Sequence, residues 1–205
     1  MSAVEELDLI ALICSRLCHD LAGSIGAVNN GVELLAEETD PVMREEAIGL
    51  IAQSAGDAAR RLAFFRLALG ASGSTADPMA VAELSRIATQ YFSGGKVSVA
   101  LPETGTDLPK SLGKALLIGL LLSAQALPRG GNVQLAPQDA GWRITAQGAM
   151  LRWPDAVAAG LAQDTGWPRE PLPALARYAR LLTEGCGLKL TAAVSETELR
   201  LDYAG

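Results

Sequence analysis

The 205-residue sequence predicts an α + α/β fold, in which an N-terminal antiparallel helical hairpin precedes an α/β sandwich. Two long helical stripes occupy the first third of the chain, and helix-like and strand-like runs alternate after it. The charge also changes between these parts: residues 1–72 carry 11 acidic and 5 basic side chains, whereas residues 73–205 carry 12 of each, so the net charge of −6 arises in the first part. We therefore expect two domains, residues 1–74 and residues 75–205.

The hairpin is predicted from apolar residues spaced three and four apart, first over residues 7–35 and again over residues 48–69. Asp40-Pro41 separates the two helices, and a small polar segment, residues 70–75, follows the second. Each helix would be on the order of 45 Å long. Two such helices packed only on each other leave apolar surface in water, so we expect a homodimer that closes a four-helix bundle.

The second domain alternates between the two kinds of element. We expect helices over residues 81–92, 109–127 and 172–183, and strands over residues 96–101, 132–136, 142–146, 187–194 and 198–203. This alternation is typical of helices packed on a mixed sheet.

Composition excludes several classes of protein. With 49% hydrophobic and 20% charged residues the chain should fold, and its negative charge argues against binding nucleic acid, which requires clustered Lys and Arg. Three cysteines and one histidine make neither a disulfide framework nor a zinc site. The longest apolar run, residues 115–127, is too short to cross a bilayer, and the N-terminus lacks a basic signal region, so we expect a cytoplasmic protein that does not bind membranes.

His19, the only histidine, lies about 200° around the first helix from both Leu17 and Leu21 and should face solvent. An exposed imidazole is mostly neutral near pH 7 and has the free lone pair that phosphoryl acceptance requires. Asp20 would hold the ring tautomer and stabilise positive charge on it. Arg16 would either contact a phosphoryl oxygen on His19 or only pair with Asp20. The alternative to a functional role is a solvated surface histidine.

The turn after His19 is bare, because it contains Ala22, Gly23 and Gly26. Each glycine inside a helix costs about 1 kcal/mol relative to alanine. Three explanations remain open: the bare surface admits another protein close to His19, it allows the two helices of the hairpin to pack closely, or the helix breaks at Asn29-Asn30-Gly31.

Two segments of the first helix, Cys18-His19-Asp20-Leu21 and residues 26–35 (GAVNNGVELL), resemble the ChpT-type histidine phosphotransferases of bacterial phosphorelays. The hairpin is also similar to the dimerisation and phosphoacceptor domain of sensor histidine kinases. The resemblance implies that His19 accepts a phosphoryl group from the receiver-domain aspartate of a hybrid sensor kinase and passes it to the receiver of a response regulator. Asp20 would be its acidic partner in catalysis. The residues expected to contact the receiver are Ser15, Arg16, Ala22, Gly23 and Gly26.

The second domain resembles the ATP-binding domain of the same kinases but lacks their nucleotide-binding residues. Where the kinases have Asn-Leu-Leu-x-Asn-Ala, residues 119–124 read GLLLSA, and where they have Asp-x-Gly-x-Gly, residues 146–150 read AQGAM. We therefore expect a degenerate ATPase-like domain that binds no nucleotide. The protein would need no metal or cofactor of its own, because Mg²⁺ would come with the docked receiver during transfer.

The leading hypothesis is thus a histidine phosphotransferase, an enzyme that carries phosphoryl groups and does not take them from ATP. Two alternatives are a divergent ATP-dependent sensor histidine kinase and a non-enzymatic dimeric adaptor that only binds receiver domains.

Overall fold

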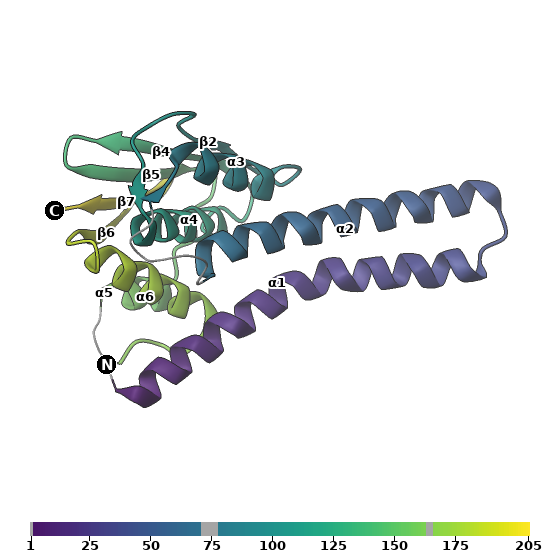
Figure 1. Cartoon of the computed structure of the whole chain (residues 1–205), viewed down its shortest axis with the longest axis horizontal. Coiled ribbons are helices and arrows are strands. Elements are labelled where there is room, and N and C mark those ends of the chain that lie inside the picture. The colour runs from purple at the N-terminus through teal and green to yellow at the C-terminus, as the bar shows by residue number, and fades with distance from the viewer. Residues whose placement is uncertain (1, 71–77, 163–165) are drawn as a thin grey trace.

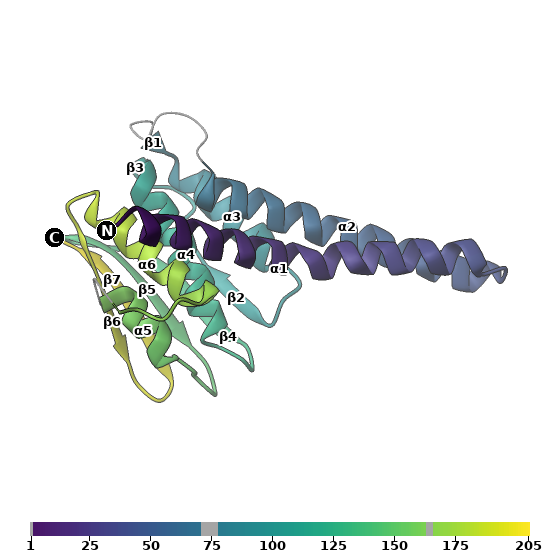
Figure 2. The ribbon, with the colours of Figure 1, turned by 90° about the horizontal axis from the view of Figure 1, so that it is seen from below.

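The computed structural model describes residues 2–70, 78–162 and 166–205. A helical hairpin projects as a long arm from an α/β unit, and both chain termini lie at the α/β end (Figure 1). Helix α1 (Ala3–Glu37) and helix α2 (Pro41–Leu69) form the arm and lie side by side along its length (Figures 1 and 2). This arrangement, with the sheet described below, confirms the predicted fold class.

Local sequence signals set the ends of the two long helices. Ser2 and Glu5 form a reciprocal capping box, which starts α1 four residues before the predicted apolar stripe. Asp40 accepts hydrogen bonds from the backbone N–H groups of Val42 and Met43, so the Asp40-Pro41 pair that ends the connection also starts α2. The helices cross closely at Gly31 of α1, where a Cβ atom would lie against Ile51 of α2.

The α/β unit contains a five-stranded sheet with the strand order β2-β4-β5-β7-β6. Strands β2 and β4 are parallel and the other neighbouring pairs are antiparallel. The strands are β2 (Val97–Ala100), β4 (Gly131–Gln138), β5 (Gly141–Gln147), β6 (Lys189–Val194) and β7 (Glu198–Ala204). Buried residues alternate along β7, as they must when only one face of a sheet meets the core.

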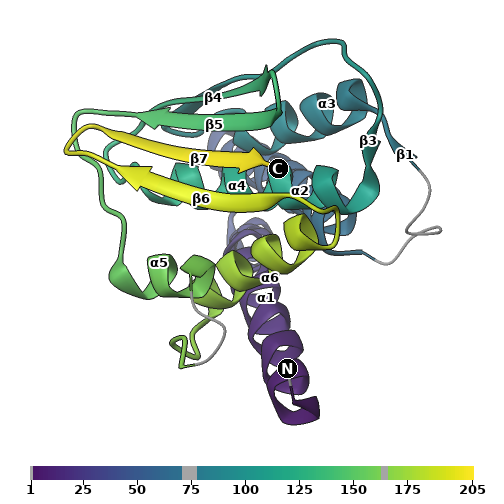
Figure 3. The same ribbon diagram turned by 90° about the vertical axis from the view of Figure 1, so that its left-hand side faces the viewer.

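The helices of this unit are α3 (Val81–Phe92), α4 (Lys110–Gln125), α5 (Asp155–Ala162) and α6 (Pro171–Glu184). Helices α3 and α4 lie behind the sheet in Figure 3, α6 lies below β6, and α4 is buried over most of its length. A separate two-stranded pairing joins β1 (Pro78–Met79) to β3 (Leu108–Pro109). The five predicted strands and three predicted helices are all present, whereas α5, β1 and β3 were not predicted.

The hairpin is anchored to the α/β unit at two places. Phe64 and Phe65, near the end of α2, lie in the main hydrophobic core together with α4 and the sheet. Near the start of α1, Leu9 packs against Trp167 and Ala174, and Asp8 pairs with Arg169. The predicted polar segment after α2 and the domain boundary between residues 74 and 75 lie outside the described residues, so the division into two domains stays a prediction.

One expectation about apolar segments needs correction. Among the described residues, α1 is long and apolar enough to cross a membrane by length and composition, with a mean hydropathy of 1.3 over its most apolar window. The longest continuous apolar run, residues 115–127, lies in and just after α4 at the centre of the core. In α1 the apolar residues are interrupted by scattered polar ones, so no continuous run is visible. The helix is one arm of the hairpin, packed along α2.

Candidate functional site

His19 lies on the exposed surface of α1, and its side chain is 81% exposed. The Asp20 side chain beside it is only 6% exposed and has two neighbours on the same helix. Arg16 donates from Nε to Asp20 Oδ2 at 2.9 Å, and the His19 Nδ1 atom lies 3.3 Å from Asp20 Oδ1. The three side chains therefore form a chain, Arg16–Asp20–His19, with the carboxylate in the middle.

This arrangement selects one form of the imidazole. A carboxylate can only accept hydrogen bonds, so the contact with Asp20 requires the proton of a neutral ring to sit on Nδ1. The other ring nitrogen, Nε2, then keeps its lone pair. The carboxylate also lies where it stabilises positive charge that develops on the ring when Nε2 forms a bond.

A groove of about 360 Å³ runs beside His19 between the two helices of the hairpin. From α1 it is lined by His19, Asp20, Gly23, Ser24 and Ala27, and from α2 by Ser54, Asp57 and Arg61. The α2 residues are spaced three and four apart, which places them on one face of the helix. The groove thus brings the predicted catalytic pair together with three polar residues of the second helix.

The groove is electrostatically mixed. Asp57 pairs with Arg60 on the same helix, and Arg61 lies over the ring of Tyr91 with its Cζ atom 6.0 Å from the ring centroid. The pKa of Tyr91 is raised to about 12, mainly by burial and also by the nearby Asp20 carboxylate, while Arg61 and Arg16 oppose the shift. Tyr91 belongs to α3, so the surroundings of Asp20 are built from three helices.

The predicted receiver-contacting residues occupy different environments. Gly23 lines the groove, and a Cβ atom on Gly23 or Gly26 would meet nothing within 4 Å. Close packing between the helices therefore does not explain these two glycines, and the tight crossing is at Gly31 instead. Ser15 and Ala22 are exposed on α1 but do not line the groove. Arg16 is engaged with Asp20, and its side chain is 17% exposed.

Sequence reasoning missed Ser54, Asp57 and Arg61 of α2 and Tyr91 of α3. A signal was present for the first three, because their spacing marks a polar face within a helix already expected to pack antiparallel to α1. Nothing in the sequence indicates that Tyr91 lies near Asp20, because this depends on how α3 packs against the hairpin.

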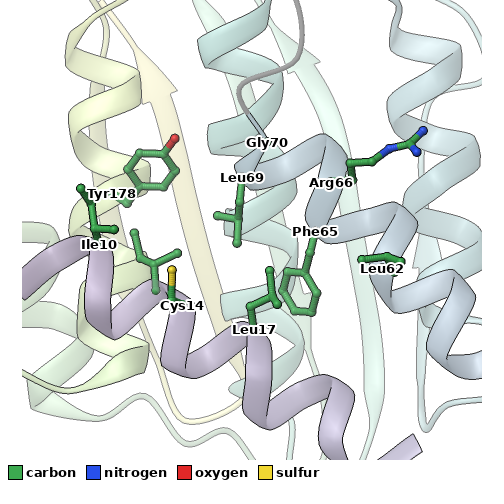
Figure 4. Close-up of a pocket in the computed structure, with 10 residues that line it drawn as sticks. Ile10, Cys14, Leu17, Leu62, Phe65, Arg66, Leu69, Gly70 and Tyr178 are labelled. Atoms are coloured by element: carbon green, nitrogen blue, oxygen red, sulfur yellow. The ribbon is translucent and has the colours of Figure 1, made fainter. Parts of the chain in front are cut away.

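The opposite flank of the hairpin is apolar. Ile10 lies about 180° around α1 from His19, and it lines a hollow of about 450 Å³ between α1, α2 and α6 (Figure 4). Cys14 and Leu17 of α1, Leu62, Phe65 and Leu69 of α2 and Tyr178 of α6 also line it. Exposed apolar residues continue along the arm from this hollow, including Ile25, Val32 and Ile48.

Of the positions aligned with the kinase nucleotide site, residues 119–123 are buried in α4. A Cβ atom on Gly119 would overlap the Tyr203 hydroxyl, which donates a hydrogen bond to the Ala115 carbonyl at 3.2 Å. Two small cavities lie near the end of α4, one of about 70 Å³ lined in part by Trp153 and one of about 210 Å³ lined in part by Lys96. Among the described residues, no cluster of three or more His, Cys, Asp or Glu side chains is arranged to hold a metal ion.

Comparison with known proteins identifies the class of this chain. Residues 81–198 match the family described as histidine phosphotransferase C-terminal domain. Protein phosphotransferase ChpT from Brucella abortus (strain 2308) is 40% identical over 198 residues, which cover 92% of this chain and 91% of that protein. A solved structure described as a bacterial phosphotransferase aligns with a TM-score of 0.79 at 36% identity, covering 98% of this chain and 96% of that one. A histidine kinase domain from Erythrobacter litoralis aligns with a TM-score of 0.40 at 14% identity, over 89% of this chain and 94% of that one.

The fold, the exposed histidine and these similarities define a protein phosphotransferase. More specifically, the chain belongs to the ChpT-type histidine phosphotransferase family, whose members act in phosphorelays. Of the three hypotheses drawn from the sequence, the first is the one that this assignment supports.

Proposed function

We propose that His19 is the phosphoacceptor of this phosphotransferase and that Asp20 is its catalytic partner. The observation that carries the proposal is the exposed imidazole whose Nδ1 faces the buried Asp20 carboxylate, because this leaves Nε2 as the free nucleophile. Arg16 acts through Asp20 as a positioning residue, since its Nε holds the second carboxylate oxygen.

The transfer step follows from this geometry. The Nε2 lone pair attacks the phosphorus of an aspartyl phosphate on a docked receiver; as the N–P bond forms, the P–O bond breaks and its electron pair leaves on the aspartate carboxylate. The ring keeps its Nδ1 proton and gains positive charge, which Asp20 stabilises. The reverse steps deliver the group to the aspartate of a second receiver. Such transfers proceed through a loose, in-line transition state, so positioning contributes most of the catalysis.

The partners we propose are the receiver domain of a hybrid sensor kinase as donor and response-regulator receivers as acceptors. Gly23, with Gly26 one turn further along α1, leaves space beside His19 in which a receiver can approach closely, and the exposed Ser15 and Ala22 extend this contact surface. Mg²⁺ for the reaction would be bound by the receiver. No ATP is required, because the phosphoryl group arrives already activated.

We also propose a homodimer. Exposed apolar residues follow the flank of the arm away from His19 as a stripe, consisting of Leu7, Ile10, Ile25 and Val32 of α1 and Ile48 and Leu62 of α2. Monomeric proteins rarely leave such a surface in water. Pairing two copies along this stripe would close a four-helix bundle and leave both His19 side chains exposed.

A cytoplasmic location fits this function. Although α1 passes the length and hydropathy test for a membrane span, it carries Arg16, His19 and Asp20 near its middle. Charged side chains at that depth of a bilayer are costly. We therefore place α1 in the hairpin, in the compartment where receiver domains meet it.

The experiment is transfer of labelled phosphate from a phosphorylated receiver to the wild-type chain and to His19→Gln. We expect label on the wild-type chain and none on the variant, because glutamine has no lone-pair nitrogen to attack phosphorus. Cys18→Ser, a nearly isosteric change at the neighbouring exposed residue, is the matched control and should accept label as the wild type does. Circular dichroism should show no change in fold, because the His19 side chain makes its one described polar contact with Asp20. Labelling of His19→Gln at the wild-type rate would contradict the assignment.

A further inference from the structure

Arg61 of α2 is a cation in the groove beside His19 whose role the transfer mechanism has not assigned. Four other charged groups at or near the groove are engaged locally: Arg16 with Asp20, and Asp57 with Arg60. Among the described residues, no carboxylate forms an ion pair with Arg61. Its charge is therefore available to a ligand that enters the groove.

The contact with Tyr91 fixes where this charge lies. Tyr91 packs against Phe64 with the ring centroids 4.1 Å apart, and against Phe92 edge-on at 4.9 Å. An arginine over the face of such a fixed ring is held in place by attraction to the π system, and its N–H donors stay free for an anion. Arg61 is thus held in position by Tyr91 of α3 and the core residues behind that ring, independently of His19.

We propose that Arg61 is a catalytic residue, which binds oxygens of the phosphoryl group while that group moves between the receiver aspartate and His19. The inference rests on His19 being the acceptor. In a loose transition state the negative charge is spread over three phosphoryl oxygens, and a guanidinium fork binds two such oxygens at once. Arg61 shares the groove with His19, so a phosphoryl group on Nε2 enters the same 360 Å³ volume.

Arg61 takes no part in the covalent bonds that form and break during phosphoryl transfer. It donates N–H hydrogen bonds to phosphoryl oxygens and keeps all its protons, while the N–P bond forms and the P–O bond breaks as above. The carboxylates of Asp20 and Asp57 line the groove and repel an anion. This repulsion is weakened because each carboxylate already pairs with an arginine. Arg61 therefore brings to the groove a positive charge that has no ion pair with a carboxylate among the described residues.

The test is the single-turnover rate of phosphoryl transfer from a phosphorylated receiver, measured at saturating receiver for the wild type, Arg61→Ala and Arg61→Lys. We expect Arg61→Ala to slow transfer on the order of 100-fold, as when one donor to a developing charge is removed from other enzymes. Arg61→Lys keeps the charge but not the fork, so its rate should fall between the two. Affinity for the unphosphorylated receiver, measured by calorimetry, should not change, because that receiver brings no phosphoryl group.

Arg86→Ala is the matched control. It removes the same charge from an exposed arginine of α3 whose described contact is with Gln90, and it should transfer at the wild-type rate. Equal slowing in Arg86→Ala would overturn the inference in favour of a general effect of net charge. The inference would also be overturned if Arg61→Ala transferred at the wild-type rate at saturating receiver, whether or not its binding of the receiver were weakened. In either case His19→Gln would still be inactive. Labelling of His19→Gln would instead refute the proposed function.

Discussion

The buried carboxylate of Asp20 connects the chemistry of His19 to the structure of the helix. It accepts from Arg16 on one oxygen and faces His19 Nδ1 with the other, so neither oxygen is free to turn. A substitution that preserves the shape of Asp20 but changes its hydrogen-bonding capacity therefore tests whether this connection sets the state of the imidazole.

Asp20→Asn is that substitution. Arg16 can only donate, so it will hold the amide oxygen and turn the amide NH₂ towards His19. Nδ1 must then accept, which moves the ring proton to Nε2 and removes the lone pair that attacks phosphorus. We expect transfer to slow about 10–100-fold, as when other carboxylates that orient a histidine are lost. Nitrogen-15 chemical shifts of the ring should show the change from the Nδ1–H to the Nε2–H tautomer.

Asp57→Asn provides the comparison, because Asp57 lines the same groove but pairs with Arg60. This variant should leave the tautomer of His19 unchanged. An Asp20→Asn protein with both the original tautomer and the original rate would show that Asp20 does not control the imidazole.

For individual residues, the sequence predicted only those features of the site that lie within a single helix. The exposure of His19 and the adjacency of Asp20 follow from helical geometry, and both are seen in the structure. Of the two roles left open for Arg16, pairing with Asp20 is seen, and contact with a phosphoryl oxygen stays a prediction. Arg61 and Tyr91 could not be predicted in the same way, since their places beside His19 and Asp20 depend on the packing of α2 and α3 against α1.

Among the elements, α1 shows two opposite uses of glycine. Gly31 lies at the helix crossing, where a Cβ atom would lie 2.6 Å from Cγ1 of Ile51. Gly23 and Gly26 face open space. Helix propensity disfavours all three glycines equally. Only at Gly31 does packing within the protein account for this cost.

Alanine substitutions should therefore have effects of opposite sign. Gly23→Ala and Gly26→Ala should each raise the free energy of unfolding by about 1 kcal/mol, whereas Gly31→Ala should lower it by about 1–3 kcal/mol because the added methyl group crowds Ile51. Denaturant unfolding monitored by circular dichroism, at one fixed chain concentration, measures both effects. The stabilised Gly23→Ala should nevertheless transfer more slowly, because its methyl group projects into the groove. Loss of stability in Gly23→Ala would instead indicate a structural need for that glycine.

The predicted elements differ from the observed ones where local signals are short or competing. Apolar periodicity located both long helices, but the capping box at Ser2 extended α1 and the Asp40 cap extended α2 beyond their apolar stripes. Strands β1 and β3 contain two residues each, too few for a periodicity to be recognised. Helix α5 has eight residues, follows Pro154 and is almost uniformly apolar, so it offers no polar face from which a helix could be predicted.

For the molecule as a whole, the arm has two faces with different roles. His19 and Arg61 lie on the groove side, whereas Ile25 lies about 240° around α1 from His19, on the apolar flank. The groove is lined by α1 and α2 of one chain, and Tyr91 of α3 contacts Arg61 within that chain. Dimerisation should therefore cover the apolar flank without contributing side chains to the site.

Ile25→Glu separates these two roles. Ile25 is exposed in the single chain, so glutamate should leave its fold intact, but in the paired bundle it would bury an unpartnered charge. Sedimentation equilibrium should give a dimer for the wild type and a monomer for Ile25→Glu at the same concentration. Leu50→Glu is the control, because this exposed leucine lies about 20° from Arg61 around α2 and so faces the groove side; it should remain dimeric. Because His19, Asp20, Arg61 and Tyr91 come from one chain, monomeric Ile25→Glu should still accept phosphate. A monomer that folds but cannot be labelled would show that the partner chain completes the site.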